Sequence, residues 1–187
     1  MTGRPDSLLL DASCLLNLYA TGCLREISAA LPYHFQVTDY VVEQEALYIW
    51  RPGPTGSRDE REPVDLTSVL REGLIQLIRL EHPAEEATFI DLAADLDDGE
   101  AITGALAFQR GYAVATDDRK ARRVLGQLSP SVRLVSTLEL LKLWVEESRV
   151  SREELASAMA AMQSCASYIP GRRDPLYEWW RSILRES

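Results

Sequence analysis

Short apolar runs alternate with stretches of helical periodicity along most of this 187-residue chain. The apolar runs predict five strands, over residues 7–11, 35–38, 74–80, 112–116 and 133–135. Periodicity and capping residues predict helices over residues 13–20, 21–31, 39–50, 65–72, 83–96, 100–110, 119–125 and 176–184, with two more beginning at residues 136 and 151. This alternation is typical of an α/β fold with a central, mostly parallel sheet flanked by helices.

Two segments interrupt the pattern. Residues 51–63 contain three prolines, two glycines and six charged side chains, so we expect a mobile surface loop there. Residues 97–99 should form a turn, and Gly111 should end the preceding helix in the left-handed conformation. The length suits one α/β domain over residues 1–137, with a helical C-terminal extension over residues 138–187 that packs on the same domain.

Composition narrows the classes of function. The 20 basic and 29 acidic residues give a net charge of −9, which argues against a protein that holds nucleic acid through its overall field. A local basic patch at a nuclease site remains compatible with this charge. No apolar run approaches the roughly 18 residues needed to span a bilayer, so we expect no membrane segment. The three cysteines follow no metal-ligand spacing and are expected to be free thiols in a reducing cytoplasm.

Acidic residues fall where predicted strands end and predicted helices begin. Asp11 closes the first apolar run, and Asp117 and Asp118 follow a later one. Glu45 lies within an apolar helical stripe, and Glu100 opens a helix. The carboxyl ends of parallel strands border the ligand-binding crevice of an open α/β sheet. Carboxylates gathered there would repel one another unless a divalent cation neutralised them, so the pattern favours a metal-dependent enzyme.

Several of these acids also have a purely structural interpretation. Asp11 could cap the helix that follows it, and any acid at the position of Glu100 would be favoured by the helix dipole. On a helix, Glu45 shares the apolar face, where an unpaired carboxylate is costly, whereas Glu43 projects to the opposite side. Glu45 is therefore the better ligand candidate. The alternative is a salt-bridged Glu45 with Glu43 as the active residue.

The two adjacent aspartates present a similar choice. The side chains of Asp117 and Asp118 must diverge, and one of them could serve only as a cap for the next helix. We take Asp118 as the inward-facing ligand, with Asp117 in support. Asp97 and Asp98 fit simple turn chemistry.

Taken in order, these residues resemble the PIN-domain family of metal-dependent ribonucleases. The matching segments are Leu8–Ser13, Val41–Leu47, Gly99–Ile102 and Ala115–Arg119, within a resemblance that covers about residues 7–137. The likeness is closest to the VapC-like toxins of toxin–antitoxin pairs and to a subgroup of uncharacterised PIN proteins near them. The tail beyond Leu138 exceeds the compact toxin pattern, and Glu100 stands where aspartate is commoner.

The resemblance implies a PIN-like three-layer sandwich and an endoribonuclease that hydrolyses RNA phosphodiester bonds. One or two Mg²⁺ or Mn²⁺ ions would bridge the carboxylates and the scissile phosphate and activate the attacking water. Carried over by position, the catalytic residues are Asp11, Glu45, Glu100 and Asp118, with Asp117 as a further metal ligand. The supporting residues are Ser13, Thr116, Glu43 and Asp98. Residues that could contact the RNA backbone are Arg119, Lys120, Arg122 and Arg123.

Several of these residues also have an ordinary structural interpretation. Ser13 and Thr116 are also ordinary hydrogen-bonding residues at strand ends, and the four basic residues also fit a solvated helix face. Trp179-Trp180 could stack on RNA, but we favour packing of a terminal helix. The two histidines fit no nucleophile or zinc pattern.

The implied partners are an RNA substrate, a second copy of the chain in a homodimer and, if the chain is a toxin, a small antitoxin protein. The alternative from another class is a non-catalytic interaction module that uses the PIN scaffold to bind a protein or RNA.

Overall fold

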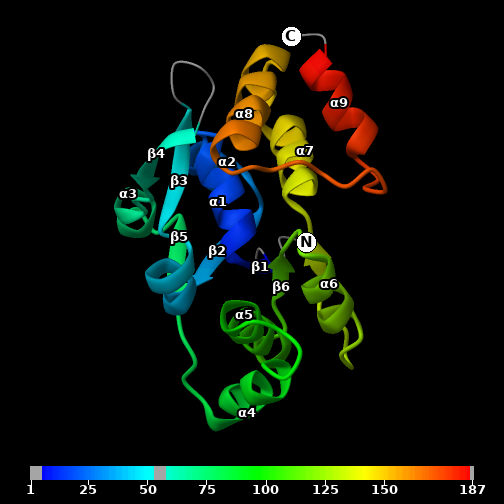
Figure 1. Ribbon diagram of the computed structural model, residues 1–187. Coiled ribbons are helices and arrows are strands. Elements are labelled where there is room, and N and C mark those ends of the chain that lie inside the picture. Colours follow the sequence, from blue (N-terminus) through cyan, green and yellow to red (C-terminus); the bar gives the residue numbers. More distant parts are fainter. Residues whose placement is uncertain (1–5, 53–57, 186–187) are drawn as a thin grey trace. The chain divides into compact units, whose positions relative to one another are not determined.

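The computed structural model describes residues 6–52 and 58–185, and the chain forms two compact units (Figure 1). The first, which we call the sheet unit, comprises Met1–Leu15, Pro32–Leu47 and Leu66–Ser136. The second, the hairpin unit, comprises Leu16–Leu31, Tyr48–Asp65 and Thr137–Ser187. Each unit is therefore built from segments that are distant in the sequence.

A five-stranded, fully parallel sheet forms the centre of the sheet unit, in the order β5-β2-β1-β6-β7. Its strands are β1 (Asp6–Leu10), β2 (Tyr33–Thr38), β5 (Ile75–Ile78), β6 (Ala113–Ala115) and β7 (Leu134–Val135). The middle strand β1 pairs with β2 on one side and with β6 on the other, and its residues Leu8, Leu9 and Leu10 are fully buried. Burial on both faces explains the continuous apolar run of this strand. The expectation of a central parallel sheet flanked by helices is confirmed.

The order of the strands creates a topological switch beside β1. From β1 the chain adds β2 and β5 on one side, and then crosses to add β6 and β7 on the other. In open α/β sheets, the crevice at such a switch lies beyond the carboxyl ends of the strands. Asp11 directly follows β1, and Asp117 soon follows β6, so both lie at the carboxyl ends of strands beside this switch.

Helices of the sheet unit surround this sheet. They are α3 (Thr67–Arg71), α4 (Pro83–Leu92), α5 (Asp98–Arg110) and α6 (Arg119–Gly126), with the π-helical turn η1 (Val41–Glu45) after β2. The central helix α5 is almost entirely buried from Gly99 to Ala107 and shares a core with β1 and β6. Gly111 ends α5 with a φ of 69°, the left-handed cap that the sequence predicted.

The hairpin unit contains a two-stranded antiparallel sheet and several helices. The strands are β3 (Tyr48–Pro52) and β4 (Arg58–Pro63), and the helices are α2 (Leu24–Ala30), α7 (Thr137–Ser148), α8 (Arg152–Cys165) and α9 (Tyr177–Arg185) (Figure 1). Helix α1 (Ala12–Ala20) begins in the sheet unit and continues into this one. Trp180 is buried where α9 contacts α8, as expected for a packing residue, and its ring stacks on Tyr177.

Two predictions of local structure were wrong. The helix expected over residues 39–50 stops after the single π turn η1, and Tyr48–Pro52 is a strand. The loop expected over residues 51–63 is largely a hairpin, in which the β-forming residues Tyr48, Ile49 and Trp50 pair with a charged strand. Residues 53–57 of the expected loop lie outside the described residues. Two of the prolines that suggested a loop, Pro52 and Pro63, lie at strand ends, where a residue without an N–H is tolerated.

A third correction concerns Thr21, which was expected to cap α2. The Thr21 hydroxyl donates to the Leu18 carbonyl (2.6 Å) and accepts from the Cys23 amide (2.9 Å), so it closes the end of α1. Cys23 occupies the N-cap of α2 without a side-chain bond. All three cysteines are free thiols, as expected. Within the described residues, none of the helices combines the length and the apolar character needed to cross a bilayer.

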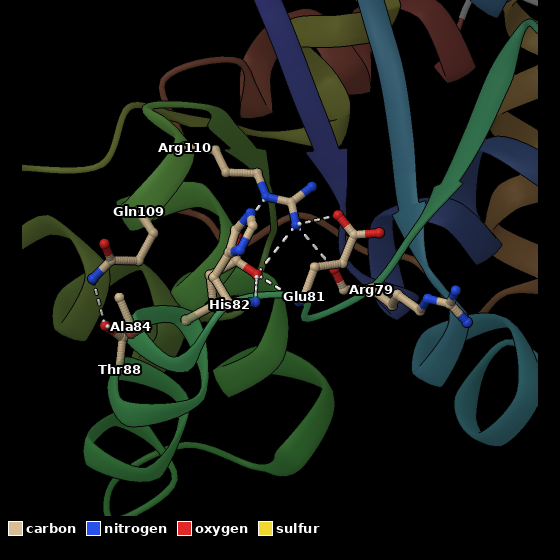
Figure 2. A network of polar contacts seen from close by, with 8 residues as sticks. Arg79, Glu81, His82, Ala84, Thr88, Gln109 and Arg110 are labelled. Atoms are coloured by element: carbon tan, nitrogen blue, oxygen red, sulfur yellow. Dashed lines mark hydrogen bonds and ion pairs between the residues drawn. The ribbon is translucent and has the colours of Figure 1, made fainter.

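A buried ion pair fastens α4 to α5 (Figure 2). The Arg110 Nε atom lies 2.7 Å from Oε1 of Glu85, whose side chain is only 2 % exposed. The Glu85 carboxylate also accepts hydrogen bonds from the backbone amides of Glu81 and His82, while Arg110 donates to the Arg79 carbonyl. The hydrogen bond to Arg110 is the largest cause that lowers the pKa of Glu85, to about 2. Glu85 therefore has a structural role, because it links α4 to α5 through Arg110.

Candidate active site

Asp11 is held rigidly at the end of β1. Its carboxylate accepts a hydrogen bond from the Cys14 amide (2.7 Å) and from the Ser13 hydroxyl (3.0 Å), and the Thr116 hydroxyl also bonds to it. The residue therefore caps α1, as its structural interpretation held. Its side chain is only 5 % exposed, and burial raises its pKa to about 6 despite these hydrogen bonds. A capping role alone does not explain why this carboxylate is buried at an energetic cost, because an aspartate caps a helix equally well on the surface.

Thr116 links Asp11 to the two aspartates after β6. The Thr116 hydroxyl accepts a hydrogen bond from the Asp118 amide (3.1 Å) while it bonds to Asp11. Oδ1 of Asp118 accepts from the amides of Lys120 (2.7 Å) and Ala121 (2.8 Å), so Asp118 is the N-cap of α6. Asp118 is exposed, whereas Asp117 is half-buried and its charge acts on Asp11. Both aspartates therefore influence the site by their charge: Asp117 raises the pKa of Asp11, and Asp118 raises the pKa of Glu100.

The π turn η1 places Glu45. Its defining hydrogen bond runs from the Ala46 amide to the Val41 carbonyl (2.7 Å), five residues back. Glu45 is half-buried and accepts a hydrogen bond from the Gly99 amide, whereas Glu43 is exposed. Glu45 is thus the more buried of the two, and its choice over Glu43 as a ligand stays a prediction. However, the helical stripe behind that choice does not exist beyond residue 45.

Gly99 allows this approach of two elements. A Cβ atom at position 99 would overlap the carboxylate of Glu45, so any side chain larger than hydrogen would push that carboxylate away. Burial raises the pKa of Glu45, and the charge of Asp97 raises it further. The close contact therefore joins η1 to the first turn of α5.

The charges of three neighbouring acids act on Glu100. Burial raises its pKa to about 7, and the charges of Asp97, Asp118 and Asp11 add to the shift. Since Glu100 lies in the first turn of α5, the helix dipole should favour the ionised form. Its raised pKa shows that desolvation and the surrounding acids outweigh that effect.

The expected acids are thus electrostatically coupled at one end of the sheet. The charges of Asp11 and Asp118 raise the pKa of Glu100, and the charge of Glu100 raises the pKa of Glu45. None of these four carboxylates forms an ion pair within the part of the chain that the structure describes. Among the same residues, no three His, Cys, Asp or Glu side chains are grouped closely enough to hold a metal ion. Among the described residues, the site is therefore a set of mutually repelling carboxylates without a preformed coordination shell.

The remaining expected residues occupy varied positions. Ser13 and Thr116 both bond to Asp11, and Asp98 accepts a hydrogen bond from the Tyr40 hydroxyl (3.3 Å). On α6, Arg122 donates to the Thr116 carbonyl (2.9 Å) and so helps to hold the end of β6. The other three basic residues of this helix are exposed, namely Arg119, Lys120 and Arg123.

Two further residues act on the site, Asp97 and Tyr40. Asp97 was read as turn chemistry, but it caps α5 by accepting from the Glu100 amide (2.9 Å), and its charge acts on both Glu45 and Glu100. Tyr40 follows β2 and reaches Asp98; partial burial and the negative charge of Asp98 raise the pKa of its hydroxyl. The acidic run before a helix was a usable signal for Asp97. Nothing in the sequence pointed to Tyr40.

Comparison with known proteins decides the family. A family model described as a PIN domain matches residues 7–173. The chain belongs to the PIN-domain family. PIN domains generally have a nuclease-type fold and typically use divalent metals, which agrees with the coupled carboxylates of this PIN domain. The match continues through α7 and α8, beyond the 7–137 range of the sequence resemblance. No curated protein and no solved structure matched the chain.

Proposed function

We propose that this PIN domain is an endoribonuclease that hydrolyses RNA phosphodiester bonds and depends on Mg²⁺ or Mn²⁺. The observation that carries the proposal is the placement of Asp11 and Asp118 after adjacent strands of the parallel sheet, with Glu100 acted on by the charges of both. Carboxylates that repel one another at a ligand-binding crevice are destabilising unless something compensates their charge. A divalent cation and the RNA that binds it would supply that compensation.

The chemistry of the donor set fits such an ion. Asp11, Glu45, Glu100 and Asp118 offer only carboxylate oxygens, the ligands that hard cations such as Mg²⁺ and Mn²⁺ prefer. Asp117 would be a further ligand. Because no three donors are grouped in advance among the described residues, ion binding should be accompanied by rotation of the longer side chains of Glu45 and Glu100. When bound, the ion would lower the pKa of the attacking water and stabilise negative charge on the phosphate.

The protein residues have separate tasks in this proposal. Asp11, fixed by Ser13, Thr116 and the Cys14 amide, orients the site because it has little freedom to move. Glu100, whose charge is disfavoured by burial and by Asp97, Asp118 and Asp11, would hold the ion together with Asp11. The exposed cations Arg119, Lys120 and Arg123 would contact the RNA backbone, offsetting the repulsion between phosphate and the acids.

The experiment compares the intact chain with Asp11→Asn. With Mn²⁺ and a labelled single-stranded RNA, the intact chain should cleave internally, and Asp11→Asn should lose both cleavage and Mn²⁺ binding, the latter measured by calorimetry. Glu86→Gln, on the exposed side of α4, is the matched control and should behave like the intact chain. Cleavage that persists in Asp11→Asn and in excess EDTA would contradict the proposal.

A second candidate is a non-catalytic module that binds RNA or a protein on the same scaffold. It is favoured by the lack of a preformed group of three metal donors among the described residues. Complete lack of Mn²⁺ affinity in the intact chain would support it.

The narrower parts of the proposal concern partners. We propose a homodimer in a cytoplasmic setting, in line with the free thiols. A toxin role would add a small antitoxin that occupies the acidic crevice, and a small open reading frame beside the gene would favour that role.

A further inference from the structure

One face of the β3–β4 hairpin carries two aromatic rings and an arginine. Tyr48 and Trp50 are two residues apart on β3, so their side chains project from the same face, and Arg61 is the cross-strand partner of Trp50. The Arg61 guanidinium carbon lies 4.2 Å from the centre of the Tyr48 ring and 5.4 Å from that of Trp50. The two rings meet edge to face at 5.8 Å. We call these three side chains the aromatic face.

The opposite face of the hairpin has a different character. Ile49 projects there and is buried, and β3 packs against α8. The same face carries Arg51, which forms an exposed ion pair with Glu62 at 3.0 Å, and Glu60. The packed face is therefore the one that bears Ile49. The aromatic face is left with half-buried rings and an exposed Arg61.

Charge distinguishes the two faces as well. Among the described side chains of the hairpin, Arg61 is the charged residue of the aromatic face, whereas the opposite face carries one cation and two acids. Among the described side chains, Arg61 forms neither a hydrogen bond nor an ion pair. Arg61 therefore holds its guanidinium over the rings of Tyr48 and Trp50.

We propose that the aromatic face binds single-stranded RNA. Bases without a pairing partner stack on the accessible parts of Tyr and Trp rings, and an arginine beside the rings can stack on a base or donate to a phosphate. A duplex offers neither free base faces nor single-strand flexibility. This surface belongs to the hairpin unit and uses none of the acids of the proposed nuclease site.

The test measures binding without chemistry. A fluorescein-labelled oligouridine is titrated with the full-length Asp11→Asn chain in EDTA at low salt, and fluorescence anisotropy gives the dissociation constant. We expect binding in the range of about 10⁻⁴–10⁻⁶ M, typical of weakly specific contacts. Trp50→Leu and Arg61→Gln, each introduced into this background, should each weaken it about tenfold, because each removes a stacking partner. A duplex of the same length should compete poorly.

Arg51→Gln is the matched control, because it removes one positive charge from the opposite face of the same hairpin. It should change the dissociation constant less than twofold, and circular dichroism should show all variants folded. Equal losses in Arg51→Gln and Arg61→Gln would overturn the proposal, since net charge alone would then explain binding. Undetectable RNA binding by the folded Asp11→Asn chain would also overturn the proposal, and a protein would then be the alternative partner of the aromatic face. Because metal and cleavage are absent from this assay, its outcome is independent of whether the proposed nuclease exists.

Discussion

Three buried or half-buried acids in this chain show how surroundings decide the behaviour of a carboxyl group. Glu85 pairs with Arg110 and its pKa is lowered to about 2, whereas burial raises the pKa of Asp11 to about 6 and that of Glu100 to about 7. The sequence placed Asp11 and Glu100 correctly at a strand end and a helix start. It gave no sign of the Glu85–Arg110 pair, because the partner is 25 residues away and only the packing of two helices brings it close.

The raised pKa values predict how Mn²⁺ binding depends on pH. The ion requires ionised carboxylates, so below pH 7 it must displace a proton from Glu100, and below pH 6 also one from Asp11. We expect the affinity for Mn²⁺, measured by calorimetry, to fall about tenfold per pH unit between pH 7 and 6 and more steeply below pH 6.

Glu100→Gln provides the control for this dependence. It should bind Mn²⁺ more weakly at pH 8 and lose the dependence between pH 7 and 6, while the step near pH 6 from Asp11 remains. An affinity that stays constant from pH 8 to 5.5 would show that these two groups do not meet the ion.

At the scale of elements, the contact between η1 and α5 is a sharper test of the site than any single acid. Gly99→Ala places a methyl group where the Glu45 carboxylate now lies. Because a displacement of about 1 Å can cost about 100-fold in rate, we expect RNA cleavage to fall by about that factor. The free energy of unfolding should change by no more than about 1 kcal/mol, because alanine favours a helix and the Glu45 side chain can move aside.

Gly126→Ala in α6 is the matched control, since a Cβ there would meet only Leu134 at 3.9 Å. It should leave the cleavage rate unchanged. If Gly99→Ala cleaves as fast as Gly126→Ala, Glu45 has no part in the reaction.

The link between α4 and α5 predicts a stability effect that depends on pH. The folded-state pKa of Glu85 is depressed from 4.5 to about 2, so its stabilisation is present above pH 4.5 and is lost as the pH falls towards 2. We expect Glu85→Gln to lower the free energy of unfolding at pH 7 by about 3 kcal/mol, measured by urea denaturation, and by much less at pH 3.

The exposed pair of Arg51 and Glu62 is the comparison for this effect. Glu62→Gln should cost less than about 1 kcal/mol, because solvent screens that pair. A similar small loss for Glu85→Gln would mean that the buried pair does not hold the two helices together.

The elements also show where sequence patterns mislead. Strands buried on both faces, such as β1, and helices with clear ends, such as α5, were predicted well because local pattern and final burial agree. The β3–β4 hairpin was missed because six residues of its strands are charged and its strands are held by pairing with each other and by contact with α8. The helix predicted over residues 39–50 failed because periodicity over η1 continued by chance into a strand.

At the scale of the whole molecule, the chain forms two units that are each assembled from distant segments. Residues 138–187 were predicted as a helical extension that packs on the same domain, and their start nearly coincides with the boundary at Thr137. However, they form a compact unit together with Leu16–Leu31 and Tyr48–Asp65, and the PIN-domain match continues to residue 173. The long-range contacts that assemble this unit leave no periodic signal in the sequence, so only the fold reveals them.

The central claim is that acids remote in the sequence share a divalent cation. The most direct measurement is the anomalous difference density of a crystal of the intact chain soaked in Mn²⁺. We expect a peak within coordinating distance of carboxylate oxygens of both Asp11 and Glu100, with Glu45 or an aspartate of the pair Asp117 and Asp118 completing the shell. Saturating Mn²⁺ without a peak at these residues, or with a peak only elsewhere on the molecule, would contradict the account.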